Sequence, residues 1–303
     1  GVLQAAALDQ AVADQILDLL VKAEGGATDS YTLVLTSQPT ANVSIALSGT
    51  QVTPSPTPVV FTTANWNTPQ TVTVTAIDDA VVEGAHSGSI TSVVSSSDAN
   101  YQGYALAPLS VAITDNDVPG VSVVQSGGNT AVAEGGATDS LSVVLQSQPS
   151  ANVTITLTGS QVTPSPTPLS FTSANWNTPQ TVTITAIDDA IDEASPHAGQ
   201  LSFAVASSDT NYQGFAVAPI AIDVTDNDTA GITLVESAGS TAATEGGAND
   251  SYTLVLNSQP TANVAIALSV GAQAQVSSGT VTFTSANWNT PQTVTVTAID
   301  DAI

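Results

Sequence analysis

The chain has 303 residues, of which 26 are Asp or Glu and only one is Lys or Arg, so its formal charge is −25. This balance argues against nucleic acid or an anionic membrane surface as a partner, because both are bound through basic side chains. It attracts cations instead. The absence of cysteine excludes disulfides, thiolate chemistry and cysteine-ligated zinc. No run of apolar residues is long enough to predict a membrane-spanning segment.

Residues 1–23 carry a pattern unlike the rest of the chain. Leu8, Val12, Ile16 and Leu19 recur at helical spacing with polar residues between them, which predicts a short N-terminal amphipathic helix. The segment lacks the basic start and the cleavage pattern of a signal peptide. Because the chain has no Met and begins with Gly, we interpret it as a mature or excerpted segment. Its Ser/Thr-rich, Lys-poor composition favours an extracellular, secreted or cell-surface setting.

From residue 24 onward, the sequence repeats itself at intervals of about one small domain. A motif containing Asn-Trp-Asn-Thr-Pro-Gln-Thr-Val-Thr recurs around Trp66, Trp176 and Trp288, with spacings of 176 − 66 = 110 and 288 − 176 = 112 residues. Units of this length fold as separate domains rather than as turns of a solenoid. We therefore expect one domain at 24–117, a second at 118–228 and a partial third at 229–303, which lacks two or three strands.

Short runs of alternating apolar and polar residues fill each copy. In the first copy they include residues 31–35, 43–47 and 71–75, and this period of two predicts half-buried antiparallel strands. About seven such strands per copy predict an all-β fold of tandem immunoglobulin-like antiparallel β-sandwiches. The prolines of residues 52–58 and 162–168 place these segments at a sheet edge or in a crossing loop, since proline cannot donate to a central ladder.

Acidic residues fall at equivalent points of each copy, at the expected tips of strands. In the first copy, a Glu-Gly-Gly turn contributes Glu24 and a strand end contributes Asp78 and Asp79. The last strand closes on Asp115 and Asp117. If these tips share one pole of the sandwich, each pair of like charges about 4 Å apart costs about 1 kcal/mol in water and more when partly buried. A bound cation removes this cost, and a set of about six to eight oxygen ligands suits Ca²⁺ better than Mg²⁺.

At these residues the sequence resembles the Calx-β repeat, a calcium-binding β-sandwich widespread in bacterial surface proteins and adhesins. The resemblance covers about residues 24–303 and rests on the Glu-Gly turn, on Ile-Asp-Asp followed by Glu, on a closing Thr-Asp-Asn-Asp and on the Asn-Trp-Asn motif. It implies a sandwich that holds calcium at one end. Carried over residue by residue, it implies these ligands: Glu24, Asp78, Asp79, Glu83, Asp115 and Asp117; Glu134, Asp188, Asp189, Glu193, Asp226 and Asp228; and, in an incomplete third site, Glu245, Asp300 and Asp301. Asp192, beside Glu193, adds or replaces a ligand.

The remaining aromatic and titratable residues favour structural roles. We expect the three tryptophans to anchor cores rather than to stack on sugars, and Tyr101 and Tyr212 to form structural corners. His86 and His197 fall in a variable loop, where we expect a surface role without chemistry. We also expect no enzyme activity, because no nucleophile has a base beside it and paired carboxylates without an aromatic cleft do not suit glycoside hydrolysis.

The leading functional hypothesis is a structural array: a calcium-rigidified stalk, sheath or filament of an extracellular adhesin-type protein, with neighbouring repeats or like subunits as partners. A calcium-switched binding module and an accessory array of a larger secreted enzyme remain alternatives. For the incomplete third copy, we favour an excerpt of a longer array over completion by strands of a neighbouring subunit.

Overall fold

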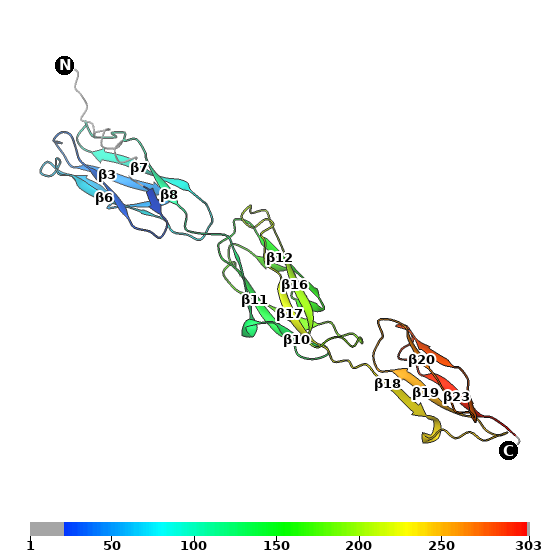
Figure 1. Ribbon diagram of the computed structural model, residues 1–303. Helices are drawn as coiled ribbons and strands as arrows, with labels where there is room; N and C mark the ends of the chain where they lie inside the picture. The colour runs from blue at the N-terminus through cyan, green and yellow to red at the C-terminus, as the bar shows by residue number, and fades with distance from the viewer. Residues whose placement is uncertain (1–20, 302–303) are drawn as a thin grey trace.

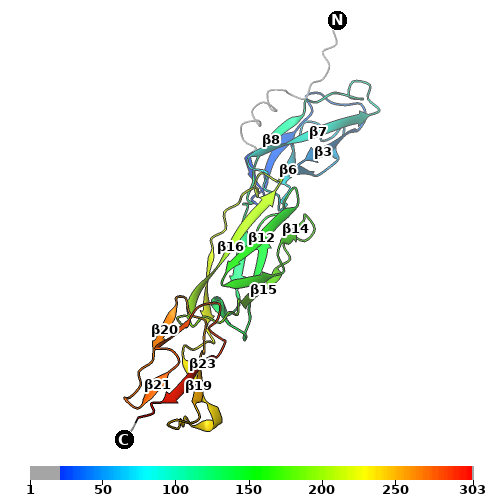
Figure 2. The same ribbon diagram turned by 90° about the vertical axis from the view of Figure 1, so that its right-hand side faces the viewer.

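The structure, a computed structural model, describes residues 21–301. These residues form β-strands and two short 3₁₀ turns, and the strands build three tandem β-sandwiches that lie end to end (Figures 1 and 2). In both views the first repeat (residues 21–117, from the blue end of the colour bar) lies at one end of the row and the third repeat (229–301, yellow to red) at the other. The expected all-β, immunoglobulin-like sandwich class is confirmed. The described residues contain no helix of the length and hydropathy needed to cross a membrane.

The first repeat packs a five-stranded sheet against a three-stranded one. The larger sheet has the order β1 (Val21–Ala23), β8 (Leu109–Thr114), β7 (His86–Ser96), β3 (Val43–Thr50) and β5 (Val59–Phe61). The smaller sheet has the order β2 (Asp29–Leu33), β6 (Gln70–Ala76) and β4 (Val52–Ser55).

The helix expected over residues 1–23 falls mostly outside the described residues. Where it overlaps them, at Val21–Ala23, the structure has strand β1, so the helical prediction is wrong there. The reason is tertiary: β1 pairs in parallel with β8, a partner about 90 residues away that the local pattern does not reveal.

The second repeat (residues 118–228) has the same two layers with an extra strand. One sheet has the order β10 (Ala131–Ala133), β17 (Ile220–Thr225), β16 (His197–Ser207), β12 (Val153–Ser160) and β14 (Leu169–Phe171). The other has the order β13 (Val162–Ser165), β15 (Gln180–Ala186), β11 (Asp139–Leu145) and β9 (Val121–Gln125), and β9 runs into the 3₁₀ turn η1 (Ser126–Gly128).

The third repeat has one complete sheet and part of the other. Its four-stranded sheet has the order β18 (Ile232–Glu236), β19 (Asp250–Leu256), β23 (Gln292–Ala298) and β21 (Ala274–Val276), with η2 (Ser237–Gly239) after β18. Only β20 (Val264–Ala267) and β22 (Thr280–Phe283) form the second sheet within the described residues. Val264 and Ile266 are therefore half-buried, whereas their counterparts Val153 and Ile155 in the second repeat, where β16 pairs alongside β12, are fully buried.

The cores follow directly from the alternating sequence. On β6, Val72 and Val74 are fully buried between the sheets, while Thr71 and Thr75 face solvent. The proline-rich strands β4 and β13 lie at sheet edges, as expected from their missing donors. Each expected core tryptophan packs against the core of its own repeat. Its backbone carbonyl accepts a hydrogen bond at the end of a strand; the Trp66 carbonyl, for example, accepts the N–H of Leu35 (3.0 Å).

The expected tyrosine corners are also present. Tyr212 is fully buried, and its hydroxyl donates to the carbonyl of Ser147 (2.9 Å) while it accepts from the N–H of the same residue (3.2 Å). Tyr101 makes the equivalent bond to the carbonyl of Ser37 (2.6 Å). Each corner ties the segment that follows the long strand of one sheet to the loop that leaves the other sheet.

The loop between β6 and β7 touches the second repeat directly. The carbonyl of Ala80 accepts the N–H of Gln148 (2.6 Å), and Val81 forms a parallel bridge with the same residue. The carbonyl of Val82 accepts a side-chain N–H of Asn211 (3.2 Å). The joint therefore consists of hydrogen bonds to backbone carbonyls of this loop as well as the connecting chain.

The second joint uses the same contact. The carbonyl of Ala190 accepts the N–H of Gln259 (2.6 Å), the counterpart of the first bond. In addition, the carboxylate of Asp192 accepts the N–H of Ala230 (3.0 Å) in the connecting segment. Asp192, considered above as a further ligand, thus has one oxygen engaged at the joint.

Candidate metal centre

Glu24 lies in the turn that follows β1, at the pole of the first repeat nearest the second. Its N–H donates to the carbonyl of Thr114 (3.0 Å), which places the turn beside the end of β8. Gly25 has φ of +61°, a left-handed conformation that glycine adopts at little cost. A Cβ at this position would also lie 3.1 Å from a carboxylate oxygen of Asp78. The Glu-Gly-Gly sequence thus turns the Glu24 side chain inward, where it is 1% exposed, and lets the Asp78 loop approach.

Asp115, directly after β8, holds two loops together. One carboxylate oxygen accepts the N–H groups of Glu83 and Gly84 (both 2.7 Å), and the other accepts the N–H of Asp117 (2.8 Å). Desolvation alone would raise the pKa of Asp115, but these three donors lower it below its ordinary value. Asp115 is therefore charged and fixes the positions of Glu83 and Asp117.

Asp78 and Asp79 follow β6 and are held in the same way. The side-chain amide of Asn116 donates both to a carboxylate oxygen of Asp78 (3.0 Å) and to the carbonyl of Glu24 (3.1 Å). One oxygen of Asp79 accepts the N–H of Val81 (2.8 Å). Asn116, which sequence reasoning did not single out, therefore ties the three acidic loops to one another.

These loops bring carboxylates from three distant segments together. One oxygen each of Glu24, Asp79 and Asp117 lies within 4.8 Å of the others. Glu24 Oε2 and Asp117 Oδ2 are buried and have no hydrogen-bond partner among the described residues. Desolvation, followed by the charge of Asp115, raises the pKa of both Glu24 and Asp117. Buried anionic oxygens without donors carry a large desolvation cost, and a cation removes it.

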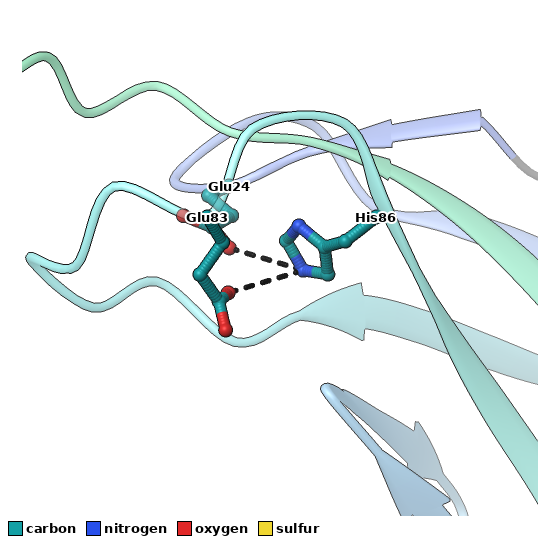
Figure 3. A group of neighbouring side chains, drawn as sticks. All are labelled: Glu24, Glu83 and His86. Carbon is teal, nitrogen blue, oxygen red and sulfur yellow. Dashed lines mark ion pairs between the residues drawn. The ribbon is translucent and has the colours of Figure 1, made fainter. Parts of the chain in front are cut away.

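His86 joins this cluster, contrary to the expectation of a surface role. It begins β7, and its Nε2 lies 3.5 Å from Glu24 Oε1 and 3.3 Å from Glu83 Oε2 (Figure 3). His197 occupies the same place at the start of β16, where its Nε2 lies 3.2 Å from Glu193 Oε2. The sequence did indicate that the two histidines are equivalent. They lie 197 − 86 = 111 residues apart, which equals the repeat interval to within one residue.

The second repeat rebuilds the cluster with a small difference in its members. One oxygen each of Glu134, Asp226 and Asp228 lies within 4.8 Å of the others. Glu134 Oε2 and Asp228 Oδ2 are again buried without a hydrogen-bond partner among the described residues. The supporting hydrogen bonds also recur, and they join Asn227 to Asp188 (3.0 Å), the N–H of Ile191 to Asp189 (2.7 Å) and the N–H of Glu193 to Asp226 (2.6 Å).

The third repeat has the turn but not the cluster. Asp300 approaches the Glu-Gly-Gly turn, with a carboxylate oxygen 3.6 Å from where a Cβ on Gly246 would lie. Glu245, Asp300 and Asp301 are all exposed. No group of three neighbouring metal-ligand donors occurs within residues 229–301.

Comparisons with known proteins show a distant relation of fold. No protein-family model matches the sequence, and no curated protein matches it. Among solved structures, the D0–D1 domain of intimin aligns with 68% of this chain and 90% of its own, at 18% identity and a TM-score of 0.22. The calcium-binding domain CBD12 of CALX1.1 aligns with 67% of this chain and 95% of its own, at 13% identity and a TM-score of 0.32. Similarities this low carry no functional argument.

Proposed function

We propose that the chain is a non-enzymatic structural array that binds calcium at the ends of its repeats. The units are those delimited from the sequence, 24–117, 118–228 and 229–303. They form part of an extended stalk, sheath or filament of an extracellular surface protein, and calcium stiffens the joints between them. The direct ligands include Glu24, Asp79 and Asp117 in the first repeat and Glu134, Asp226 and Asp228 in the second.

The observation that carries this proposal is the set of buried oxygens at the pole of each complete repeat that have no hydrogen-bond partner within residues 21–301. Glu24 and Asp117 come from opposite ends of the first repeat's sequence, and one carboxylate oxygen of each lies within 4.8 Å of the other. The one lysine of the chain is engaged elsewhere, since Lys22 Nζ lies 3.5 Å from Asp29 and donates to the carbonyl of Ala27. Carboxylate oxygens gathered without a lysine or arginine beside them are donors that calcium prefers.

The link from calcium to stiffness is the loop between β6 and β7. Asp79 and Glu83 lie at either end of the segment that bonds to the second repeat through the carbonyls of Ala80 and Val82. A cation that fixes Asp79 also fixes the backbone that makes these bonds. Because the second repeat has the same loop and the same bond to the third, each ion acts at a joint as well as within a repeat.

The first experiment measures thermal unfolding with calcium and with a chelator. A ligand that binds only the folded state stabilises it by about 2.7 kcal/mol at a hundredfold excess over Kd. We therefore expect the melting temperature to rise in calcium, and the rise for the first repeat to be reduced in a Glu24→Gln variant. Asp223→Asn removes the same charge from an exposed position on β17 and serves as the control. Superimposable melting curves in calcium and in chelator would refute calcium binding.

The second experiment measures the joint itself. The chain has no cysteine, so Ser95→Cys and Ala206→Cys, at exposed positions on β7 and β16, would supply two unique labelling sites. We expect the distribution of distances between spin labels at these sites to narrow in calcium. If calcium is shown to bind but the width of the distance distribution does not change, the chain is a calcium-binding array whose joints the ion does not stiffen.

A further inference from the structure

His86 and two glutamates form a second group of donors beside the carboxylate cluster. The ligand atoms of His86, Glu24 and Glu83 lie within 4.8 Å of one another. In Figure 3 the His86 ring points at both glutamates, with its Nε2 3.5 Å from Glu24 Oε1 and 3.3 Å from Glu83 Oε2. Glu24 belongs to both groups: Oε1 faces the histidine, and the buried Oε2 has no hydrogen-bond partner among the described residues.

Hydrogen bonds hold the imidazole and one carboxylate in a ligand-like orientation. His86 Nδ1 lies 2.9 Å from the carbonyl of Gly84, so Nδ1–H donates, and in the neutral imidazole the lone pair of Nε2 is directed toward the glutamates. The Gln51 side-chain amide donates to both oxygens of Glu83 (3.0 and 3.1 Å). Histidines and carboxylates that bind metals are oriented by such bonds. A lone pair that faces two anions is repelled by them unless a proton or a metal cation lies between.

We propose that His86, Glu24 and Glu83 bind a divalent transition-metal ion of the zinc class, in a position next to the calcium site but distinct from it. Calcium takes oxygen donors, whereas zinc takes imidazole nitrogen together with carboxylate oxygen. Tetrahedral zinc bonds of about 2.0–2.1 Å place ligand atoms about 3.3 Å apart, close to the separations in the structure. Two glutamates and a neutral imidazole balance the charge of the ion, and water completes its coordination. This site goes beyond the proposed function and does not require calcium.

The second repeat holds a looser version of the same group. His197 Nε2 lies 3.2 Å from Glu193 Oε2 but 3.9 Å from Glu134 Oε1, and its Nδ1 has no hydrogen-bond partner among the described residues. Gln161 lies 3.3 Å from both oxygens of Glu193, farther than in the first repeat. The site at His86 is therefore the tighter of the two.

The test is a titration of the 303-residue chain with Zn²⁺ alone, which is then repeated in saturating Ca²⁺. Binding is followed by calorimetry and by the ¹⁵N chemical shifts of the two imidazoles. The chain suits this test because it has only two histidines and no cysteine. We expect two zinc ions to bind, the tighter one shifting the Nε2 resonance of His86. His86→Gln weakens the tighter site by more than about 100-fold, beyond the roughly 10–100-fold loss expected when only a supporting residue is removed. His197→Gln, the matched variant, weakens only the second site. Glu83→Gln, at a carboxylate 29% exposed, removes a ligand with little risk to folding.

Three outcomes would overturn the proposal. Zinc that binds without moving the His86 resonance would lie among the carboxylates alone. Zinc that calcium displaces completely would show one shared cation position rather than two. A His86→Gln/His197→Gln double variant with wild-type zinc affinity would show that the histidines are not ligands. If the proposed function fails because calcium does not bind, the titration in zinc alone still decides this inference.

Discussion

Replacing Glu24 by Gln removes a charge from the centre of the first cluster and keeps the shape of the side chain. One oxygen each of Glu24, Asp79 and Asp117 lies within 4.8 Å of the others, so Glu24 takes part in two repulsive pairs. At that separation each pair costs about 0.9 kcal/mol in the dielectric of water. Salt of about 0.1 M screens part of this. The variant is therefore expected to be more stable than the wild type by about 1–2 kcal/mol when no metal is bound.

Thermal unfolding in chelator, followed by circular dichroism, measures this directly. For a unit of about 100 residues, 1 kcal/mol corresponds to about 4–8 °C in melting temperature, so the transition of the first repeat is expected to rise by at least about 4 °C. In saturating calcium the wild type is expected to melt at the higher temperature, because the variant lacks a ligand for the ion. The control, Asp223→Asn, is expected to shift neither transition by more than about 0.5 kcal/mol, the usual range for surface substitutions. A Glu24→Gln protein that is less stable than the wild type in chelator would refute the repulsion argument.

Three further predictions concern the scaffold. Tyr212→Phe removes a buried hydroxyl that donates to a backbone carbonyl, and its free energy of unfolding, measured in urea, is expected to fall by about 1–3 kcal/mol. Gly159→Ala places a Cβ against the carbonyl oxygen of Val162 and is expected to cost about 1–3 kcal/mol, whereas Gly271→Ala, with open space around the added atom, stays near the wild type in the same assay. Backbone N–H bonds lower the pKa of Asp98, so its contribution to stability is present above pH 3.8 and is lost as the pH falls below that value. The difference in melting temperature between wild type and Asp98→Asn is therefore expected to shrink between pH 5 and pH 2, and a constant difference would contradict this.

The sequence predicted the strands and their packing well because the repeats impose a strict period of two. Val72 and Val74 alternate with threonines, and a one-residue shift would have exposed them both, so the pattern fixes the register as well as the fold. The edge strands and the tyrosine corners followed from the chemistry of proline and of a buried hydroxyl. The strand at Val21–Ala23 could not be predicted, because it exists only through its partner β8.

At the candidate metal centre, the sequence predicted which segments carry acids but not how each acid is used. The expectation that these segments meet at one pole agrees with the structure, which places oxygens of Glu24, Asp79 and Asp117 together. That these oxygens bind calcium remains a prediction. Asp115 belongs to the same acidic pattern, yet its carboxylate accepts three backbone N–H groups, which only the loop conformation reveals. His86 was missed because the segment around it was interpreted as a variable loop, although the recurrence of the histidine in register did carry the information.

The repeated hydrogen bond between successive units, Ala80 to Gln148 and Ala190 to Gln259, has a geometric consequence for longer arrays. In an array whose boundaries were equivalent in all their contacts, each added unit would be related to the previous one by the same rotation and translation. Such an operation generates a regular superhelix, whose length grows in proportion to the number of units and whose pitch is set by a few backbone atoms. A change in that loop would therefore alter the course of the whole fibre, because the angular error would add at each step.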